Sequence, residues 1–540
     1  MAYPAKQSVT LGAFLLCLFL TVRPGISDDP PELVQRGDQA ARADRHEEAI
    51  RNYEEAIAIN PSLRPTLLHK LGRQYLWWDR PTAAAELFLE ATQHTPADCD
   101  LRLDLGMALS WSDQLKEAVK VYRQAQETCP QRKIDALLGE ARTLRWRDRT
   151  LEADQLYRIV EHEGNAAQKE DARLGLALNL LARDRNRAAR ERLHTLAQAK
   201  PTDSAVLEGL AVSALRLGAR EDSQRVIREG LEKRPADHRL AEFGEYLRRL
   251  PRPIQRTTAR VFHDGDGTDY WGVQLSLLYE LATPSRIELL GGNSSLRTPI
   301  AGKTKEITGF WGGVGYEQYF NESWTMRGEV KFLRYAGADY RPWTGEMNAL
   351  WTPRDDLRVD FAAARILIFD NWAALKNKLH GDFFSGGLDW WFSEQNRMSL
   401  AIDSTQWNTD NLRMRYRFSV AHQFQSAPRV TVSWATLFQT YDQGFPFALF
   451  SPEQYVETGP TANLSGRFRK YWTYALETRV GTLRESQGDW LPLGFFSATL
   501  ERELWRNWGI QWGFSFSNSN ISSATGFRRT AGSMVLQYRF

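Results

Sequence analysis

From residue 255 to the end of the sequence, apolar and polar residues alternate at a period of two. Between Trp271 and Tyr279, for example, the odd positions are all apolar, whereas the even ones include Gly272 and Gln274. A period of two places successive side chains on opposite faces of a β-strand. The apolar faces carry rings and aliphatic side chains that would over-fill a sandwich core, while the polar faces carry glycine, small and charged residues. We therefore expect an antiparallel barrel that is apolar outside and polar within.

The alternation predicts 16 strands of roughly 9 to 14 residues, centred near residues 258, 273, 290, 310, 327, 346, 362, 387, 400, 416, 433, 461, 476, 495, 512 and 533. Links at residues 320–322, 353–356 and 394–396 are short, whereas those from Phe369 to Gly381 and from Tyr441 to Tyr455 are long. Short periplasmic turns and long outer loops are typical of bacterial outer-membrane barrels. An even count also returns the last strand to the side on which the first begins.

The last strand alternates to a terminal aromatic residue through Met534, Leu536, Tyr538 and Phe540. This pattern resembles the C-terminal signature of proteins handled by the outer-membrane barrel-assembly machinery. The resemblance implies that Phe540, Tyr538 and Leu536 form an assembly signal, with that machinery and outer-membrane lipid as partners. Outside the N-terminal apolar run described below, no stretch of the sequence is long and apolar enough for a transmembrane helix. We therefore expect that the chain can enter a membrane only as a closed barrel.

The N-terminus has the pattern of a secretory signal peptide over residues 1–27. Lys6 gives a positive charge, an apolar run extends from Leu11 to Val22, and Gly25-Ile26-Ser27 offers small residues for cleavage. The apolar run is too short to span a bilayer as a helix. A lipoprotein anchored at Cys17 is the alternative, which we disfavour because Leu16 precedes the cysteine and the apolar run continues past it.

Residues 28–250 contain a repeat of 34 to 35 residues. Three sets recur at this spacing: Gly37, Gly72 and Gly106; Tyr53, Phe88, Tyr122 and Tyr157; and Ala49, Ala84, Ala118, Ala153 and Ala188. The pattern resembles the tetratricopeptide repeat, in which small residues let two antiparallel helices touch. About six units fit, which suits a solenoid. Residues 251–254 are the predicted linker, because Pro251 and Pro253 end the helical pattern before the barrel at 255–540.

A second ladder runs through the repeats at Trp77, Trp111 and Trp146. In the resembled family this position lines the concave groove. One interpretation is that the rings pack between neighbouring units. The other is that they form a stacking track for a sugar chain or a partner peptide.

Beyond the predicted signal peptide, two cysteines remain, Cys99 and Cys129. An exported protein meets an oxidising compartment, so a disulfide between them is allowed. They flank one predicted helical hairpin, whose antiparallel helices bring those two ends together. The alternative is a pair of buried thiols. Zinc is not expected, because no Cys-x-x-Cys pair or paired histidines occur at ligand spacing.

Several charged residues fall on the predicted inner face of the barrel. Arg413, Arg415 and Arg417 alternate with apolar residues, and on the lipid side each would cost about 2–4 kcal/mol at mid-bilayer. Inside, either carboxylates such as Glu329 or Glu477 pair with them, or anionic sugars do. Together with the three arginines, the candidate lumen residues are Arg327, Glu329, Lys331, Glu477 and Arg479.

Catalytic and cofactor motifs are absent from the sequence, so we expect neither an enzyme nor a cofactor. The segment Asp264–Asp269 superficially resembles a calcium loop, but it lacks the remaining ligands and is better interpreted as a turn. The chain carries 69 Lys and Arg against 66 Asp and Glu. This balance argues against a nucleic-acid binder that relies on a basic field.

The predicted fold is a multidomain α+β chain, with an all-α tetratricopeptide solenoid followed by an antiparallel 16-stranded transmembrane barrel. This architecture resembles the exopolysaccharide export porins for poly-N-acetylglucosamine and cellulose, and the YaiO-type outer-membrane barrels. The resemblance implies an outer-membrane exporter whose periplasmic repeats recruit exopolysaccharide or its synthase and modifying proteins. A scaffold or surface receptor with a plugged barrel is the alternative, and an enzyme within the barrel ranks third.

Overall fold

The computed structural model describes residues 29–281, 285–426, 428–445, 450–468, 471–505, 507–519 and 528–540. The predicted signal peptide and Cys17 lie outside these residues. The chain divides into two compact units, Met1–Thr128 and Cys129–Phe540, which are described separately. The first unit contains helices α1 to α6, and the second contains helices α7 to α13 and the barrel.

The repeat region consists of helices in antiparallel pairs, which confirms the predicted solenoid. In the first unit the helices are α1 (Pro30–Arg42), α2 (His46–Ile59), α3 (Arg64–Trp77), α4 (Pro81–His94), α5 (Cys99–Trp111) and α6 (Leu115–Thr128). In the second they are α7 (Lys133–Trp146), α8 (Thr150–Glu163), α9 (Ala166–Ala182), α10 (Asn186–Ala199), α11 (Ser204–Arg216), α12 (Arg220–Lys233) and α13 (His238–Arg249). Helix α13 has no following partner helix, because β1 begins at Ile254.

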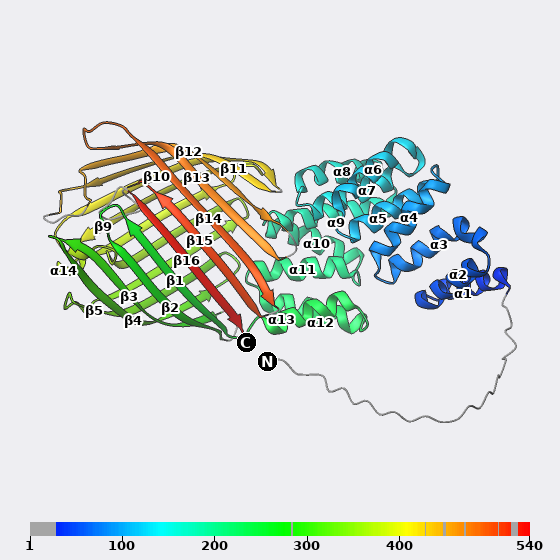
Figure 1. Ribbon diagram of the computed structural model, residues 1–540, viewed down its shortest axis with the longest axis horizontal. Helices are drawn as coiled ribbons and strands as arrows, with labels where there is room; N and C mark the ends of the chain where they lie inside the picture. The colour runs from blue at the N-terminus through cyan, green and yellow to red at the C-terminus, as the bar shows by residue number, and fades with distance from the viewer. Residues whose placement is uncertain are drawn as a thin grey trace, which may run out of the picture. The chain divides into compact units, whose positions relative to one another are not determined.

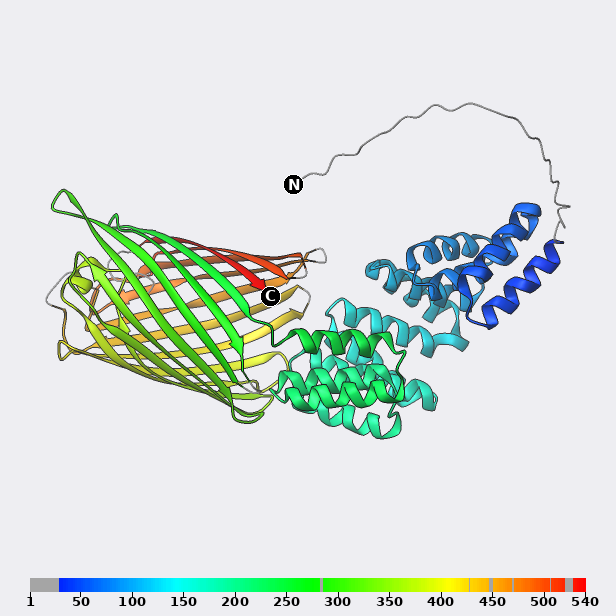
Figure 2. The same ribbon diagram turned by 90° about the horizontal axis from the view of Figure 1, so that it is seen from below.

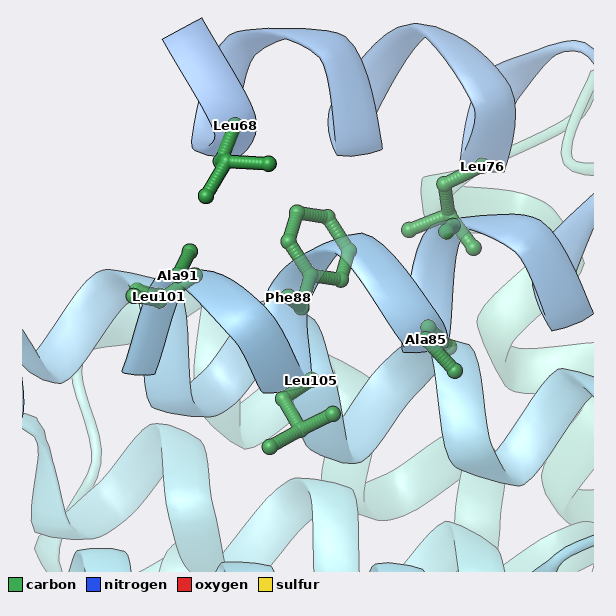
Figure 3. Close-up of a cluster of buried hydrophobic side chains, with 9 residues drawn as sticks. Leu68, Leu76, Ala85, Phe88, Ala91, Leu101 and Leu105 are labelled. Carbon is green, nitrogen blue, oxygen red and sulfur yellow. The ribbon is translucent and has the colours of Figure 1, made fainter. Parts of the chain in front are cut away.

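The recurring glycines are required by the aromatic residues that recur with them. A Cβ atom added to Gly37 or Gly72 would lie 2.5 Å from the ring of Tyr53 or Phe88, closer than any real contact. Phe88 of α4 is fully buried between leucines of α3 and α5, as Figure 3 shows. Burying a phenylalanine contributes about 1.5–3 kcal/mol, so each glycine secures the packing of its unit.

A second recurring residue, which is not part of the repeat pattern given above, shapes the turn inside each helix pair. Five aspartates occupy left-handed backbone conformations with φ between 54° and 64°: Asp44, Asp79, Asp113, Asp148 and Asp184. Gly218 takes the same place in the next pair, with φ 81°. Aspartate and glycine tolerate this conformation better than branched residues do, so the aspartate ladder is a turn signal at the repeat period.

The barrel is closed and has 16 strands, which confirms the predicted count. The strands are β1 (Ile254–Asp264), β2 (Asp269–Glu280), β3 (Ser285–Ile300), β4 (Lys303–Tyr319), β5 (Trp324–Ala336), β6 (Trp343–Arg354), β7 (Leu357–Leu367), β8 (His380–Trp390), β9 (Asn396–Trp407), β10 (Leu412–Ser426), β11 (Arg429–Tyr441), β12 (Gln454–Arg467), β13 (Trp472–Glu485), β14 (Leu491–Trp505), β15 (Trp508–Ser517) and β16 (Arg529–Arg539). Each contains its predicted centre, although β3, β4, β10 and β14, at 15 to 17 residues, are longer than expected. Every strand pairs antiparallel with its neighbours, and β16 closes on β1.

The outer face of the barrel is apolar and exposed. Phe332 on β5 is 68% exposed and Phe384 on β8 is 59% exposed, whereas Glu329, on the opposite face of β5, is only 9% exposed. Exposed aromatic and aliphatic side chains on most of the strands suit a lipid environment, and closure of the barrel leaves no unpaired strand edge in the lipid. The barrel is therefore of the outer-membrane type. Among the described helices, none is long and apolar enough to cross a membrane.

The predicted assembly residues lie on the outer face at the closure of the barrel. Leu536 lies opposite Thr257 in the pairing of β16 with β1. The ring of Tyr538 packs against Trp508 at 4.7 Å and against Phe540 at 5.0 Å. The role of these residues in assembly remains a prediction.

Cys99, the first residue of α5, and Cys129, which follows α6, are both disulfide-bonded. A bridge between them closes a loop of about 30 residues and would contribute roughly 3 kcal/mol. Protein unfolded without reductant should therefore show no alkylation at either cysteine, and reductant should expose both. Peptide mapping after alkylation measures this, and two alkylated cysteines before reduction would refute the bridge.

Candidate functional site

The last helices of the repeat region contact one end of the barrel, within the second unit (Figures 1 and 2). We call this end, where β1 begins and β16 ends, the proximal end, and the opposite end the distal end. Arg220 of α12 pairs with Glu280 at the end of β2, and these side chains are only 8% and 15% exposed. Arg190 of α10 pairs with Glu322 in the β4–β5 turn. The Arg220–Glu280 pair fixes α12 on the barrel, because leaving either of these largely buried charges unpaired is costly.

A carboxylate of the barrel caps helix α10. Asp355, in the β6–β7 turn, accepts hydrogen bonds from the backbone N–H groups of Arg187 at 3.1 Å and Ala188 at 3.0 Å. Arg185, at the N-cap position of α10, makes no side-chain cap of its own. The β6–β7 turn thus provides an acceptor for backbone N–H groups that have no partner within α10. It also places a negative charge at the N-terminus of α10, which is the positive end of the helix dipole.

Replacing Asp355 tests directly whether the β6–β7 turn holds helix α10 on the barrel. Asp355→Ala should destabilise the first turn of α10 by about 1–2 kcal/mol, because two backbone donors lose their acceptor. Hydrogen exchange of the amides at Arg187 and Ala188 should accelerate accordingly. The control is Asp356→Ala, which removes a neighbouring carboxylate that pairs with the exposed Arg354. Equal exchange in the two variants would show that Asp355 does not hold the helix.

A cavity of about 960 Å³, the vestibule, lies at the proximal end. Its wall combines residues of the helical segment, such as Arg183 and Arg187, with lumen-facing residues of the strands, such as Thr431 and Asn463. A second cavity of about 380 Å³ lies deeper, lined among others by Asp360, on the lumen face of β7. The vestibule therefore connects the repeat helices to a polar and partly hollow lumen.

The three arginines of β10 share the lumen face of that strand. Arg413, Arg415 and Arg417 lie opposite to Tyr416 and Phe418, whose side chains are 42% and 41% exposed on the outer face. This is the arrangement that the alternation predicts. The strand order places them on the same wall as β9, which supplies their partner.

That partner is Asp403 of β9, and not Glu329 or Glu477 as expected. Its carboxylate is fully buried and lies 3.8, 2.8 and 3.1 Å from the guanidinium groups of Arg413, Arg415 and Arg417. Asp403 lies directly across from Arg415 in the strand pairing, so register brings the charges together. One carboxylate for three arginines leaves this wall positively charged.

The two expected partners are engaged elsewhere. Glu329 contacts Arg327 at 3.4 Å and pairs with Lys331 on its own strand. Glu477 lies 4.0 Å from Arg479, whose nearer partner is Glu457 of β12 at 3.7 Å. The pairs of Glu329 and the Glu477–Arg479 contact thus lie within single strands, whereas the Arg479–Glu457 pair joins β13 to β12.

The loop between β7 and β8, residues 368–379, folds into the distal end of the barrel, and we call it the plug loop. It contains the short helix α14 (Trp372–Lys376), which lies at the barrel end away from the C-terminus in Figure 1. Leu375 is 1% exposed and packs in a cluster with Leu296, Ile307 and Tyr335, which line the facing wall formed by β3, β4 and β5. The sequence predicts a long outer loop here, but it does not predict that the loop turns inward.

An ion pair holds the plug loop to a further wall. Asp370 lies 2.8 Å from Arg529 at the start of β16, and both side chains are largely buried. On its other side, Ala374 packs with Trp407 of β9 and Tyr441 of β11. Because it contacts β3, β9 and β16, the plug loop crosses the distal mouth of the barrel.

The tryptophan ladder remains exposed. The rings of Trp77 and Trp111 meet edge to face at 5.8 Å, and these side chains are 55% and 41% exposed. Trp146, in the second unit, is 43% exposed. The first two rings therefore pack on each other and still offer exposed surface to a ligand.

Metal sites are absent from the part of the chain that the structure describes, in which no group of three or more His, Cys, Asp or Glu side chains could hold an ion. The segment Asp264–Asp269 is the turn between β1 and β2. Asp264 accepts hydrogen bonds from the backbone of Asp266 and Thr268, as a turn residue does.

Comparison with known proteins adds little. No family model and no curated protein matches the sequence. Similar solved structures include a bacterial polysaccharide outer membrane secretin, with 12% identity and a TM-score of 0.44 over 54% of this chain and 99% of that one. A tetratricopeptide repeat protein from Parabacteroides merdae has 16% identity and a TM-score of 0.34 over 41% of this chain and 90% of that one. CdiB from Acinetobacter baumannii has 8% identity and a TM-score of 0.35 over 54% and 60%. At such low similarity, nothing about the function of this chain follows from them.

Proposed function

We propose that the protein exports an exopolysaccharide across the outer membrane, with its repeat region in the periplasm. The observation that carries this proposal is the vestibule of about 960 Å³, whose wall is shared by repeat helices and lumen-facing strand ends. A polymer gathered by the repeats would meet a polar path that leads directly into the barrel. No chemical step is assigned to the protein in this proposal.

The chemistry of the vestibule suits a sugar chain. Hydroxyl and amide groups from Thr431, Asn463 and Thr473 can exchange hydrogen bonds with sugar hydroxyls. The wall also contains the aromatic residues Tyr319, Trp391 and Tyr474, and aromatic rings are the side chains on which pyranose rings stack. A sixteen-stranded barrel is wide enough to leave an aqueous channel once its interior is not filled by side chains.

The plug loop is the resting gate in this proposal. It closes the distal mouth against leakage and must move aside when polymer passes. The exposed rings of Trp77 and Trp111 are then a docking place for polymer or for synthase and modifying proteins.

The second candidate function is a surface scaffold or receptor that transports nothing. The complete burial of Ala374 and Leu375 in the distal mouth favours it, because a permanently filled barrel needs such packing. The two functions differ in whether the plug loop ever opens.

Deleting the gene in cells that make the polymer tests the proposal. We expect polysaccharide to disappear from the cell surface and to accumulate in the periplasm, and we expect the intact gene to reverse both effects. Surface polymer at the normal level in the deletion strain would contradict export and favour the scaffold. Blotting of surface and periplasmic fractions with a lectin that recognises the polymer measures how the polysaccharide is distributed between them.

A further inference from the structure

We infer that the vestibule binds an anionic glycan through four arginines that no carboxylate of the described chain neutralises. These are Arg358, Arg397, Arg429 and Arg467, and all four line the vestibule. The inference rests on the proposed function and adds the chemical class of the polymer. Guanidinium groups present a planar fork of donors that matches carboxylate and phosphate groups, so the polymer would carry one of these.

The strand register brings these arginines together. Arg358 begins the lumen face of β7, Arg397 that of β9 and Arg429 that of β11. Arg467 ends β12 on the same face, two residues beyond Ser465, which lies across from Arg429. All four lie at the proximal ends of their strands, where a polymer would arrive first.

The other arginines of the vestibule are engaged. Arg183 lies 3.5 Å from Glu394, and Arg216 lies 3.3 Å from Asp184. Arg354 is 3.0 Å from the carboxylate of Asp356. By contrast, none of the four inferred binding arginines forms a salt bridge with any residue in the described ranges.

Four of the five vestibule carboxylates pair with arginines other than these four: Asp184, Glu322, Asp355 and Glu394. Asp355 lies 3.6 Å from Arg187 and caps α10, and Glu322 pairs with Arg190. The cavity wall holds nine arginines against five carboxylates, so its field is positive. A positive wall around a concave cavity concentrates anions and disfavours a cationic polymer.

An aromatic ring completes the site. The guanidinium of Arg397 lies 5.7 Å from the centre of the Trp391 ring, and Arg185 approaches that ring at 6.0 Å. A sugar ring stacked beside Trp391 would place its acidic substituent within reach of Arg397. Beyond the vestibule, the arginines around Asp403 continue the positive wall, and Arg417 remains 47% exposed.

Binding to the purified full chain in detergent tests the inference without any transport. The probes are oligogalacturonate, which carries carboxylates, a phosphorylated mannan oligosaccharide, and neutral cello-oligosaccharide, measured by calorimetry at low and high salt. We expect one or both anionic probes to bind, the neutral one to bind far more weakly, and salt to weaken binding. The two anionic probes distinguish carboxylate from phosphate as the recognised group.

Matched variants locate the site. Arg358→Gln should weaken anionic binding about tenfold, the loss of one charge-assisted contact. Arg354→Gln removes a charge four residues away that Asp356 already neutralises, and it should leave binding unchanged. The combined change of Arg358, Arg397, Arg429 and Arg467 to Gln should abolish binding, while a heat-dependent gel shift verifies that the barrel has folded.

Equal binding of neutral and anionic probes, or equal effects of Arg354→Gln and Arg358→Gln, would overturn the inference. These outcomes differ from a failure of the proposed function. Normal surface polymer after gene deletion would contradict export even where anionic binding is observed. Conversely, suppose that the deletion strain loses secretion and that the purified protein binds neutral and anionic probes equally. Export would then be supported, and the inference that the polymer is anionic would be wrong.

Discussion

Deleting residues 370–378 of the plug loop should convert a closed barrel into an open pore. The deletion removes α14 together with Ala374 and Leu375, which fill the distal mouth, and it removes the partner of Arg529. Single-channel conductance in a planar bilayer should rise by about tenfold or more above that of the intact chain, because an unfilled sixteen-stranded barrel holds a water-filled channel.

Point variants separate opening from damage to the barrel. Leu375→Asp puts an unpaired charge into the apolar cluster beside Ile307 and Tyr335. It should destabilise the packing of the plug loop, so that single-channel recordings show frequent opening events. Lys376→Asp changes the next residue, which is exposed, and it should leave the barrel closed. A deletion variant that folds but conducts no better than the intact chain would show that other residues close the lumen.

Replacing Asp403 with Asn should cause a large loss of stability. The variant keeps the shape of the side chain but leaves three arginines on one wall without their shared carboxylate. Breaking a buried ion pair by removing one partner costs roughly 3 kcal/mol or more. The midpoint of urea unfolding in lipid vesicles should fall accordingly.

The control is Asp356→Asn in the β6–β7 turn. Asp356 pairs with Arg354 at 3.0 Å, but these side chains are 38% and 62% exposed. A solvent-exposed pair contributes only about 0–1 kcal/mol, so this variant should unfold near the midpoint of the unmodified chain. Equal midpoints for the two variants would mean that Asp403 does not hold the β9–β10 wall.

The alternation of the sequence was sufficient to predict the strands and their faces. Because side chains alternate strictly along a strand, the positions of Tyr416 and Phe418 determine that Arg415 and Arg417 face inward. The pairing register was not predictable in the same way. Asp403 is partnered by Arg415 through the β9–β10 register, and nothing in either strand alone specifies that register.

The plug loop and the docked helices were missed for a different physical reason. Their contacts join segments far apart in the chain, such as Asp370 with Arg529 and Arg187 with Asp355. No periodic pattern encodes such contacts. One signal was present for the plug, since Trp372 to Leu375 is an apolar run in a predicted outer loop, where exposed apolar residues are unfavourable.

The vestibule arginines were visible in the sequence as single charges beside short turns. Arg358, Arg397 and Arg429 each lie close to the start of a strand, where a solvated rim charge is the ordinary interpretation. Their importance appears only when the closed barrel brings four such strand ends around one cavity. The arrangement of the strands in the closed barrel also determines which of the vestibule arginines lie next to a carboxylate.

Locking the plug loop in living cells tests the central claim most directly. In an Asp370→Cys, Arg529→Cys variant, a short bifunctional thiol-reactive linker would tie the loop to β16 where the native ion pair spans 2.8 Å. Secretion of polymer is measured before and after linking, with Asp370→Cys alone as the control. We predict that linking reduces surface polymer to the level of the deletion strain and that the single-cysteine control secretes normally. Unchanged secretion from cells in which the linkage is complete would show that the polymer does not pass through this barrel.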